Sequence, residues 1–386
     1  MKKISIFGVT GSIGSSTVKI ILLDKAKYNV QVLTANKNYK KLAKLSKLLR
    51  SKYAIIGDEK YFLLLKKELK NTNIRCLTGR SNLEKFAKIK TDILISAIVG
   101  MAGLRPTYNA IGNTKLLAIA NKESIVVAGN ILLNKARRLK TIVLPLDSEH
   151  HAIFQVYKKE NKNNIKEIIL TASGGPFWNK EKINFDKITV KNALKHPTWR
   201  MGKKITIDSA TMMNKLLEII EASILFNLDL GKIKILIHPS SLIHGIVNFI
   251  DGTSHLIASE PDMKIPISHA LHWPERLNSN VKNLDFKNIK NFKFYCPNKK
   301  IFPSLSLINI LKKNDYNKSK IITINAANEV AVDYFLRKKI SFNDIIKIIK
   351  KTITLIKHIN INSINDVMNI DNKARNITDM IINRKI

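Results

Sequence analysis

The first 150 residues alternate short runs of β-branched and other apolar residues with stretches of helical spacing. Helical spacing occurs at Tyr39–Arg50 and Tyr61–Lys70. Strands that alternate with helices along a chain form a parallel sheet covered by helices. The sequence therefore predicts an α/β protein whose residues 1–150 form a doubly wound, Rossmann-like domain. The expected strands are Ile4–Phe7, Val30–Ala35, Tyr53–Ile56, Ile93–Ser96, Leu116–Ala120 and Ile142–Leu146.

The remaining residues divide into three further parts by composition and periodicity. Residues 151–275 mix strands with helices, which predicts a central α+β catalytic domain. Residues 276–303 are rich in Asn and Lys and are interpreted as a linker, and residues 304–386 are predicted to form a C-terminal helical bundle. The expected elements are the strands Ile165–Thr171 and Ile233–Ile237 and the helices Ser304–Lys312, Thr323–Arg337 and Phe342–His358.

A glycine-rich loop joins the first predicted strand to a helix expected to begin near Ser15. Gly8, Gly11 and Gly14 let the backbone turn tightly and bring helix N–H groups close to a pyrophosphate, although a plain turn would have the same pattern. After the second strand, residues 36–38 (Asn-Lys-Asn) offer a cation and amides where an NAD site would have a carboxylate. This indicates NADPH, whose 2′-phosphate they would bind, unless the lysine is incidental in a Lys-rich chain.

Carboxylates follow the strand predicted at residues 142–146. Asp147 and Glu149 are two apart on a segment that we expect to be extended, so both would point to one side. With Glu218 they would supply three oxygen ligands for Mg²⁺ or Mn²⁺. His150 and His151 raise the alternative of zinc, but no third imidazole or thiol follows at matching spacing.

A helix predicted from Met212 onward would present Asn214, Lys215 and Glu218 on one face. Ser209 would stand at the start of that helix, where a hydroxyl and free backbone N–H groups gather. A cation and neutral donors suit a phosphate, and a neighbouring carboxylate suits a hard metal ion. The alternative for this spacing alone is a solvated Lys–Glu pair.

A loop of about residues 174–202 lies between a Gly-Gly-Pro turn and Met-Gly, and is a candidate lid. It carries Trp199, which could equally pack in the core, and His196. His196 and Ser173 could complete a phosphate site with the helix described above. Residues 121–124 (Asn-Lys-Glu-Ser) follow the fifth strand and would reach the same edge of the sheet.

The formal net charge of +37 raises the alternative of a basic nucleic-acid-binding protein. The lysines are scattered along the chain and no nucleic-acid-binding motif is present, so neither a nucleic acid nor a membrane is an expected partner. Cys76 and Cys296 are isolated, which favours a reducing compartment. No apolar run reaches the roughly 18 residues of a membrane span, so a cytoplasmic protein is expected.

These residues together resemble the 1-deoxy-D-xylulose 5-phosphate reductoisomerase family. The likeness extends over nearly the whole chain. The matching blocks are Gly8 to Gly14, Asn121 to Ser124, Asp147 to Gln155, Ser173 to Phe177, His196 to Glu218, His238 to His244, Glu260 to Met263 and Asn325 to Glu329.

The resemblance implies a homodimeric enzyme of the methylerythritol phosphate route to isoprenoids that uses NADPH and Mg²⁺ or Mn²⁺. It would rearrange the carbon skeleton of a phosphorylated ketose and then reduce the resulting aldehyde. The implied metal ligands are Asp147, Glu149 and Glu218, which with Lys122 form the catalytic set. The other implied substrate contacts are Ser148, Ser173, His196, Trp199, Ser209, Asn214 and Lys215. The implied NADPH contacts are Thr10, Gly11, Ser12, Ile13, Asn36, Lys37, Asn38, Asn121, Glu123 and Gly202.

Two positions depart from the family pattern. Asn36 and Leu216 each stand where a glycine is usual, and the segment after Gln155 is shorter than in many members. None of these changes removes a reacting group, so activity is expected, with weakened affinity for the cofactor. The remaining alternative is another NADPH-dependent oxidoreductase, of the semialdehyde or homoserine dehydrogenase type, which would leave the carboxylates and the phosphate site unused.

Overall fold

The computed structural model describes residues 1–157, 159–180, 183–199, 201–312 and 318–383. The chain folds into two compact units, which are described separately below. The first comprises Met1–Ser124, Leu132–His151 and Asp262–Lys282, and the second Ile125–Ile131, Ala152–Pro261 and Asn283–Ile386. The chain passes from the first unit to the second after His151, beside the boundary predicted at residue 150. Residues 262–282 belong to the first unit again. The division into functional domains stays a prediction.

The first unit contains a seven-stranded sheet in the order β4-β3-β2-β1-β5-β6-β7, and all its neighbouring strands are parallel. Six of its strands match the predicted ones to within two residues at each end. β4 was not predicted, because it is a short strand at the edge of the sheet with only two apolar side chains. The strands are β1 (Lys2–Phe7), β2 (Tyr28–Ala35), β3 (Tyr53–Ile56), β4 (Arg75–Thr78), β5 (Thr91–Ser96), β6 (Thr114–Ile119) and β7 (Ile142–Pro145).

The direction of the connections reverses at β1, which lies between β2 and β5. In sheets of this kind the reversal point is where a nucleotide binds, and the glycine-rich loop directly follows β1. A Cβ on Gly8 would lie 2.4 Å from the carbonyl oxygen of Ala97, and Gly8 has a φ of +83°. A Cβ on Gly14 would lie 2.4 Å from the Cα of Val9. Both glycines are therefore required by close backbone packing.

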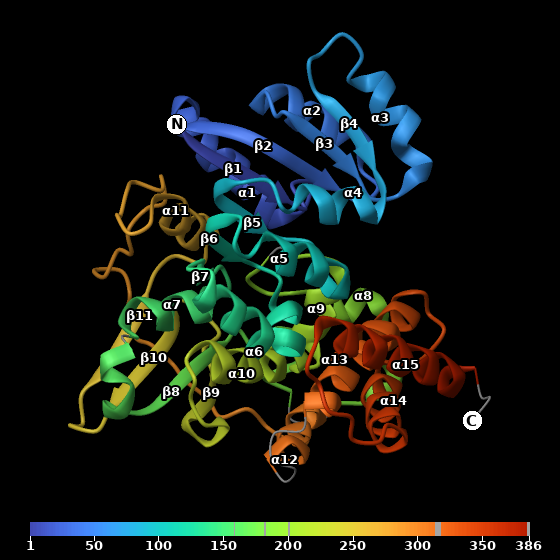
Figure 1. Ribbon diagram of the computed structural model, residues 1–386. Helices are drawn as coiled ribbons and strands as arrows, with labels where there is room; N and C mark the ends of the chain where they lie inside the picture. Colours follow the sequence, from blue (N-terminus) through green and yellow to red (C-terminus); the bar gives the residue numbers. More distant parts are fainter. Residues whose placement is uncertain (158, 181–182, 200, 313–317, 384–386) are drawn as a thin grey trace. The chain divides into compact units, whose positions relative to one another are not determined.

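The helices of the first part of the chain follow the strands as predicted (Figure 1). The first helix starts at Ser12, three residues before its predicted start, and α11 returns from later in the chain to pack against it. The helices are α1 (Ser12–Ile21), α2 (Tyr39–Leu49), α3 (Phe62–Glu68), α4 (Gly79–Phe86), α5 (Leu104–Ala110), α6 (Lys122–Arg138), α7 (Ser148–Val156) and α11 (Lys264–His272).

The second unit contains a four-stranded sheet in the order β11-β10-β8-β9. β8 (Ile165–Ala172) and β9 (Ile233–Ile237) are parallel and were both predicted. β10 (Ile243–Phe249) and β11 (Ser254–Ala258) are antiparallel and were not predicted. β10 is interrupted by Gly245, which weakens the strand pattern but is needed because a Cβ there would lie 2.8 Å from Ile153. β11 lies at the edge of the sheet, and its first three residues are exposed.

The helices of the second unit include three long C-terminal helices, α13, α14 and α15, that pack against one another. Ser341 and Ser363 begin α14 and α15 with capping boxes, which satisfy the free N–H groups of the first turn. This confirms the predicted helical region. The helices are α8 (Val190–Ala193), α9 (Lys203–Ala210), α10 (Met213–Leu225), α12 (Leu307–Lys312), α13 (Lys318–Leu336), α14 (Phe342–Leu355) and α15 (Ile364–Ile382).

Candidate active site

The acidic turn of the first unit lies between β7 and α7. The sequence predicted an extended segment here, and this was wrong, because α7 already begins at Ser148. The cause is Asp147, whose Oδ1 accepts hydrogen bonds from the backbone N–H groups of Glu149 (3.2 Å) and His150 (3.4 Å). A carboxylate in this position favours the start of a helix. Glu149 therefore extends from the first turn of a helix, and the Ser148 hydroxyl donates to its carboxylate.

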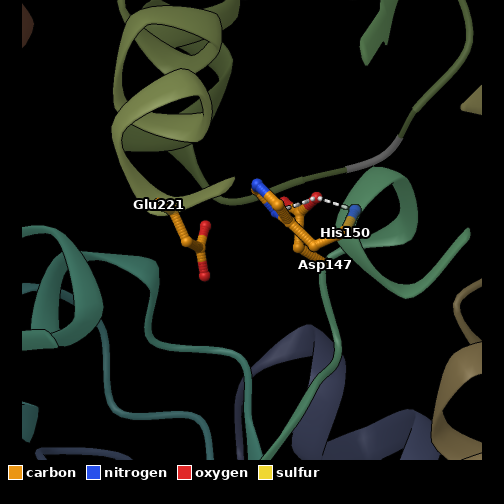
Figure 2. A group of neighbouring side chains, drawn as sticks. All are labelled: Asp147, His150 and Glu221. Atoms are coloured by element: carbon orange, nitrogen blue, oxygen red, sulfur yellow. Dashed lines mark hydrogen bonds and ion pairs between the residues drawn. The ribbon is translucent and has the colours of Figure 1, made fainter. Parts of the chain in front are cut away.

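Asp147 is held on both of its oxygens by neighbouring side chains. Lys122 Nζ lies 2.7 Å from Oδ2. His150 Nδ1 lies 3.0 Å from Oδ1, as Figure 2 shows. The Asp147 and Lys122 side chains are only 13% and 7% exposed, and His150 is fully buried. Interactions between charges are strengthened by such burial. Lys122 was a predicted site residue, whereas the role of His150 in orienting Asp147 was missed, although its spacing of three on a helix allowed it.

The predicted cofactor residues of the first unit lie in loops that follow parallel strands. Thr10, Gly11, Ser12 and Ile13 span the turn from β1 into α1. Asn36, Lys37 and Asn38 are exposed after β2, and Asn38 accepts a hydrogen bond from Lys41 N (3.0 Å) as the N-cap of α2.

Asn121 is another predicted cofactor residue, and its side chain makes hydrogen bonds within the first unit. Its Oδ1 accepts from Ser124 N (2.6 Å) and caps α6, and its Nδ2 donates to the carbonyl of Gly100 (2.8 Å). This side chain holds the β6–α6 turn in place, and with it the buried Lys122 and Glu123. The turn is thereby fixed before any ligand arrives.

In the second unit, α10 presents Asn214, Lys215 and Glu218 on one face, as predicted. Lys215 Nζ lies 2.5 Å from Glu218 Oε2, and Asn214 Nδ2 donates to Oε1 at 2.5 Å. Lys215 Nζ also donates to the carbonyl of Thr171 near the end of β8 (2.6 Å). Lys215 is 3% exposed and Glu218 is fully buried, which excludes the alternative of a solvated surface pair. Such burial costs desolvation energy that offsets the attraction of the pair, so the pair is weak evidence for a role in stability alone.

The expectation that Ser209 stands at the start of α10 was wrong. It lies in the last turn of α9, and the chain then turns at Met212, which has a φ of +59°. Ser209 is nevertheless near the end of β8, because the turn after Ser173 packs against it. A Cβ on Gly175 (φ +64°) would lie 2.9 Å from the Ser209 carbonyl oxygen. The glycine allows this close approach.

The His196 ring has a defined protonation state. Its Nδ1 accepts the backbone N–H groups of Trp199 (2.8 Å) and Thr198 (3.2 Å), so the proton lies on Nε2. Nε2 is 2.9 Å from the Ser173 hydroxyl. Burial lowers the pKa of His196 from 6.5 to about 4, so the ring is neutral near pH 7. Ser173 and His196 are thus brought together as neutral donors.

Comparison with known proteins assigns the chain to one family. Family models match residues 4–129 (1-deoxy-D-xylulose 5-phosphate reductoisomerase), 143–226 (the C-terminal domain of that enzyme) and 258–377 (DXP reductoisomerase C-terminal domain). A relative of the same name from Wolbachia pipientis subsp. Culex pipiens is 45% identical over 100% of this chain and 98% of its own. The chain belongs to the 1-deoxy-D-xylulose 5-phosphate reductoisomerase family.

Solved structures agree with this membership. The 1-deoxy-D-xylulose 5-phosphate reductoisomerase of Zymomonas mobilis in complex with NADPH is 40% identical, with a TM-score of 0.91 over 99% of both chains. A DOX-P reductoisomerase in complex with NADPH, fosmidomycin and magnesium is 35% identical, with a TM-score of 0.94 over 99% of this chain and 98% of that one.

The two departures from the reductoisomerase pattern have local explanations. The Asn36 side chain fills the space beside Gly57, where an added Cβ would lie 2.9 Å from Asn36 Oδ1. Leu216 is fully buried on the face of α10 that also buries Leu217 and Ile220. Leu216 is thus accommodated in the core, whereas Asn36 lies at the surface.

The candidate lid of this reductoisomerase runs from about residue 174 to residue 202, and residues 181, 182 and 200 lie outside the described part. The Trp199 ring is partly buried, with its centroid 6.3 Å from that of His244. Gly202 is the N-cap residue of α9, and a Cβ there would meet open space. The motion of this segment stays a prediction.

The lowered pKa of His196 predicts a pH dependence of stability. Between pH 4 and 6.5 the unfolded chain binds a proton at His196 that the folded chain does not. The free energy of unfolding therefore rises with pH through this window. The contribution of His196 to stability is lost as the pH falls through the same window. We expect His196→Asn to make this dependence shallower, as measured by urea unfolding at several pH values. Parallel curves for the two proteins would contradict the assignment.

Proposed function

We propose that this protein converts 1-deoxy-D-xylulose 5-phosphate into 2-C-methyl-D-erythritol 4-phosphate with NADPH and a divalent cation. The observation that carries the proposal is the buried Asn214–Lys215–Glu218 face of α10 in a member of the reductoisomerase family. It combines phosphate donors with a metal-ligating carboxylate one helical turn away.

We propose that Asp147, Glu149 and Glu218 hold the cation, which would be Mg²⁺ or Mn²⁺ because all three offer carboxylate oxygens. Asp147 and Glu149 belong to the first unit, and Glu218 belongs to the second. When bound, the metal polarises substrate oxygens as a Lewis acid. A second candidate set is Asp147, His150 and Glu221, but its imidazole suits zinc better than Mg²⁺.

We propose that the other polar residues orient the substrate. Lys122 and Ser148 would bind its hydroxyl and carbonyl groups, next to the carboxylates with which they pair. Binding energy from the unreacting phosphate would be used to position the sugar and to exclude water. The proposed phosphate donors are Ser173, His196, Ser209, Asn214 and Lys215 of the second unit.

The cofactor residues fit NADPH in chemical character. The turn from β1 into α1 offers backbone N–H groups, and the turn after β2 carries Lys37 between two amides without a carboxylate. Bound NADPH supplies a hydride to the substrate. We propose that Lys37 and its two neighbours bind the 2′-phosphate.

The proposed function is tested by following NADPH oxidation with 1-deoxy-D-xylulose 5-phosphate as substrate. We expect turnover that EDTA abolishes and that added Mg²⁺ or Mn²⁺ restores, because the reaction needs a Lewis acid. Aspartate semialdehyde serves as the control substrate and should give no NADPH oxidation. Turnover that is unaffected by EDTA would favour another NADPH-dependent oxidoreductase.

We further propose that the protein is a homodimer. β11 forms one edge of the four-stranded sheet, and an edge strand presents unpaired backbone groups to a second copy. Light scattering after gel filtration should give twice the mass of one chain. A monomer at micromolar concentration would contradict the proposal.

We also propose a cytoplasmic location, which suits free cysteines such as Cys76 and Cys296. Within the described residues, none of the helices has both the length and the apolar content of a membrane span.

A further inference from the structure

Lys41 connects the two loops that are predicted to bind the cofactor. It lies in the first turn of α2, the helix that begins directly after residues 36–38. Its Nζ donates to the carbonyl oxygen of Thr10 (2.9 Å) and to the hydroxyl of Ser15 (2.7 Å). The Ser15 hydroxyl in turn donates to the carbonyl of Gly11 (2.6 Å). The ammonium group thus joins α2 to the glycine-rich loop.

The charge of Lys41 adds to that of a helix end. α1 starts at a glycine N-cap without a side-chain hydrogen bond, and its first turn contains no acidic residue. The first turn of α2 also contains none. The two acceptors of the ammonium, Thr10 O and Ser15 Oγ, are neutral, so its positive charge is not cancelled by them. An anion next to the α1 N-terminus would therefore meet both a helix dipole and a cation.

We propose that Lys41 is a positioning residue for the diphosphate of the dinucleotide cofactor. It holds the glycine-rich loop in the shape that receives the diphosphate, and it contributes a positive charge there. The two hydrogen bonds use two of the three donors of an ammonium group, and both go to the loop after β1 and the first turn of α1. This role differs from that proposed for Lys37, which would bind the 2′-phosphate. The inference rests on the proposed binding of NADPH.

The test compares dissociation constants of the full chain for NADPH and NADH, measured by cofactor fluorescence without substrate. We expect Lys41→Ala to raise both constants by about tenfold, because the diphosphate is common to both cofactors. Lys40→Ala is the matched control: it removes the same charge from an exposed position on the same helix and should change either constant less than about twofold. Lys41→Arg keeps the charge and should recover part of the loss, and Ser15→Ala should have a smaller effect.

Three outcomes would overturn the inference. Equal constants for Lys41→Ala and Lys40→Ala would leave Lys41 without a role in binding. A loss confined to NADPH would place Lys41 at the 2′-phosphate instead of the diphosphate. A fall in melting temperature that accounts for the whole loss, without recovery in Lys41→Arg, would make its role purely structural. If the unaltered protein bound no NADPH at all, the proposed function itself would fail.

Discussion

Replacing Glu218 by Gln is expected to reduce turnover by at least about 10³-fold, since a Lewis acid contributes several kcal/mol to such a reaction. Glutamine has nearly the same volume as glutamate and can still accept a hydrogen bond from Asn214, but it is a poor ligand for Mg²⁺. The dissociation constant for NADPH should change less than about twofold, because the proposed cofactor residues Thr10–Ile13 and 36–38 belong to the other unit. Steady-state kinetics and cofactor fluorescence measure the two effects separately.

The Glu218→Gln experiment also distinguishes the two candidate sets of metal ligands. Glu221 lies on the same helix, is equally buried, and belongs to the set with His150. If the carboxylate set is correct, Glu221→Gln should keep a larger part of the metal affinity than Glu218→Gln. The reverse order would move the metal to Asp147, His150 and Glu221. Loss of both turnover and NADPH binding in Glu218→Gln would indicate that the variant does not fold.

Replacing Lys215 by Ala is expected to lower kcat/KM for the phosphorylated ketose by about 10²-fold or more, because charge-assisted hydrogen bonds to a buried phosphate are lost. The variant also leaves Glu218 without its cation in a buried place, which is costly. Thermal unfolding should therefore be measured alongside the kinetics. An unchanged kcat/KM would remove Lys215 from the phosphate site.

Two controls isolate the phosphate contribution. Lys203→Ala removes an exposed lysine from α9 and should leave kcat/KM within about twofold of the unaltered protein. The ketose without its phosphate should be a poor substrate for both proteins, and its kcat/KM should fall far less in Lys215→Ala. A similar fall for both substrates would mean that Lys215 acts through Glu218 alone.

The sequence predicted those parts of the fold whose signal is local. The central strands of the parallel sheet, such as β3 and β5, are buried and read as continuous apolar runs, so their positions could be found directly. β4 and β11 are edge strands without a fully buried side chain, and each combines apolar with polar residues, so neither gave a continuous buried run. The start of α7 was missed because one carboxylate, Asp147, caps the helix, and periodicity does not detect a cap.

Only part of the candidate site could be predicted from the sequence. The face of α10 followed from helical spacing, and Lys215 and Glu218 do lie together. The partner of Lys215 on the sheet, the carbonyl of Thr171, is a backbone atom 44 residues away and leaves no sequence signal. The neutral state of His196 likewise depends on burial and on the N–H groups of its own loop. Such features come from tertiary structure and could not be predicted from residue types.

The Lys215–Glu218 pair has a thermodynamic consequence for ligand binding. A phosphate that accepts hydrogen bonds from Lys215 takes the place of the Glu218 carboxylate. That carboxylate then retains its hydrogen bond from Asn214 but has a buried negative charge to neutralise, which a divalent ion can do. Sugar phosphate and cation should consequently raise one another's affinity by the same factor, and calorimetric titration of each in the presence of the other would measure it.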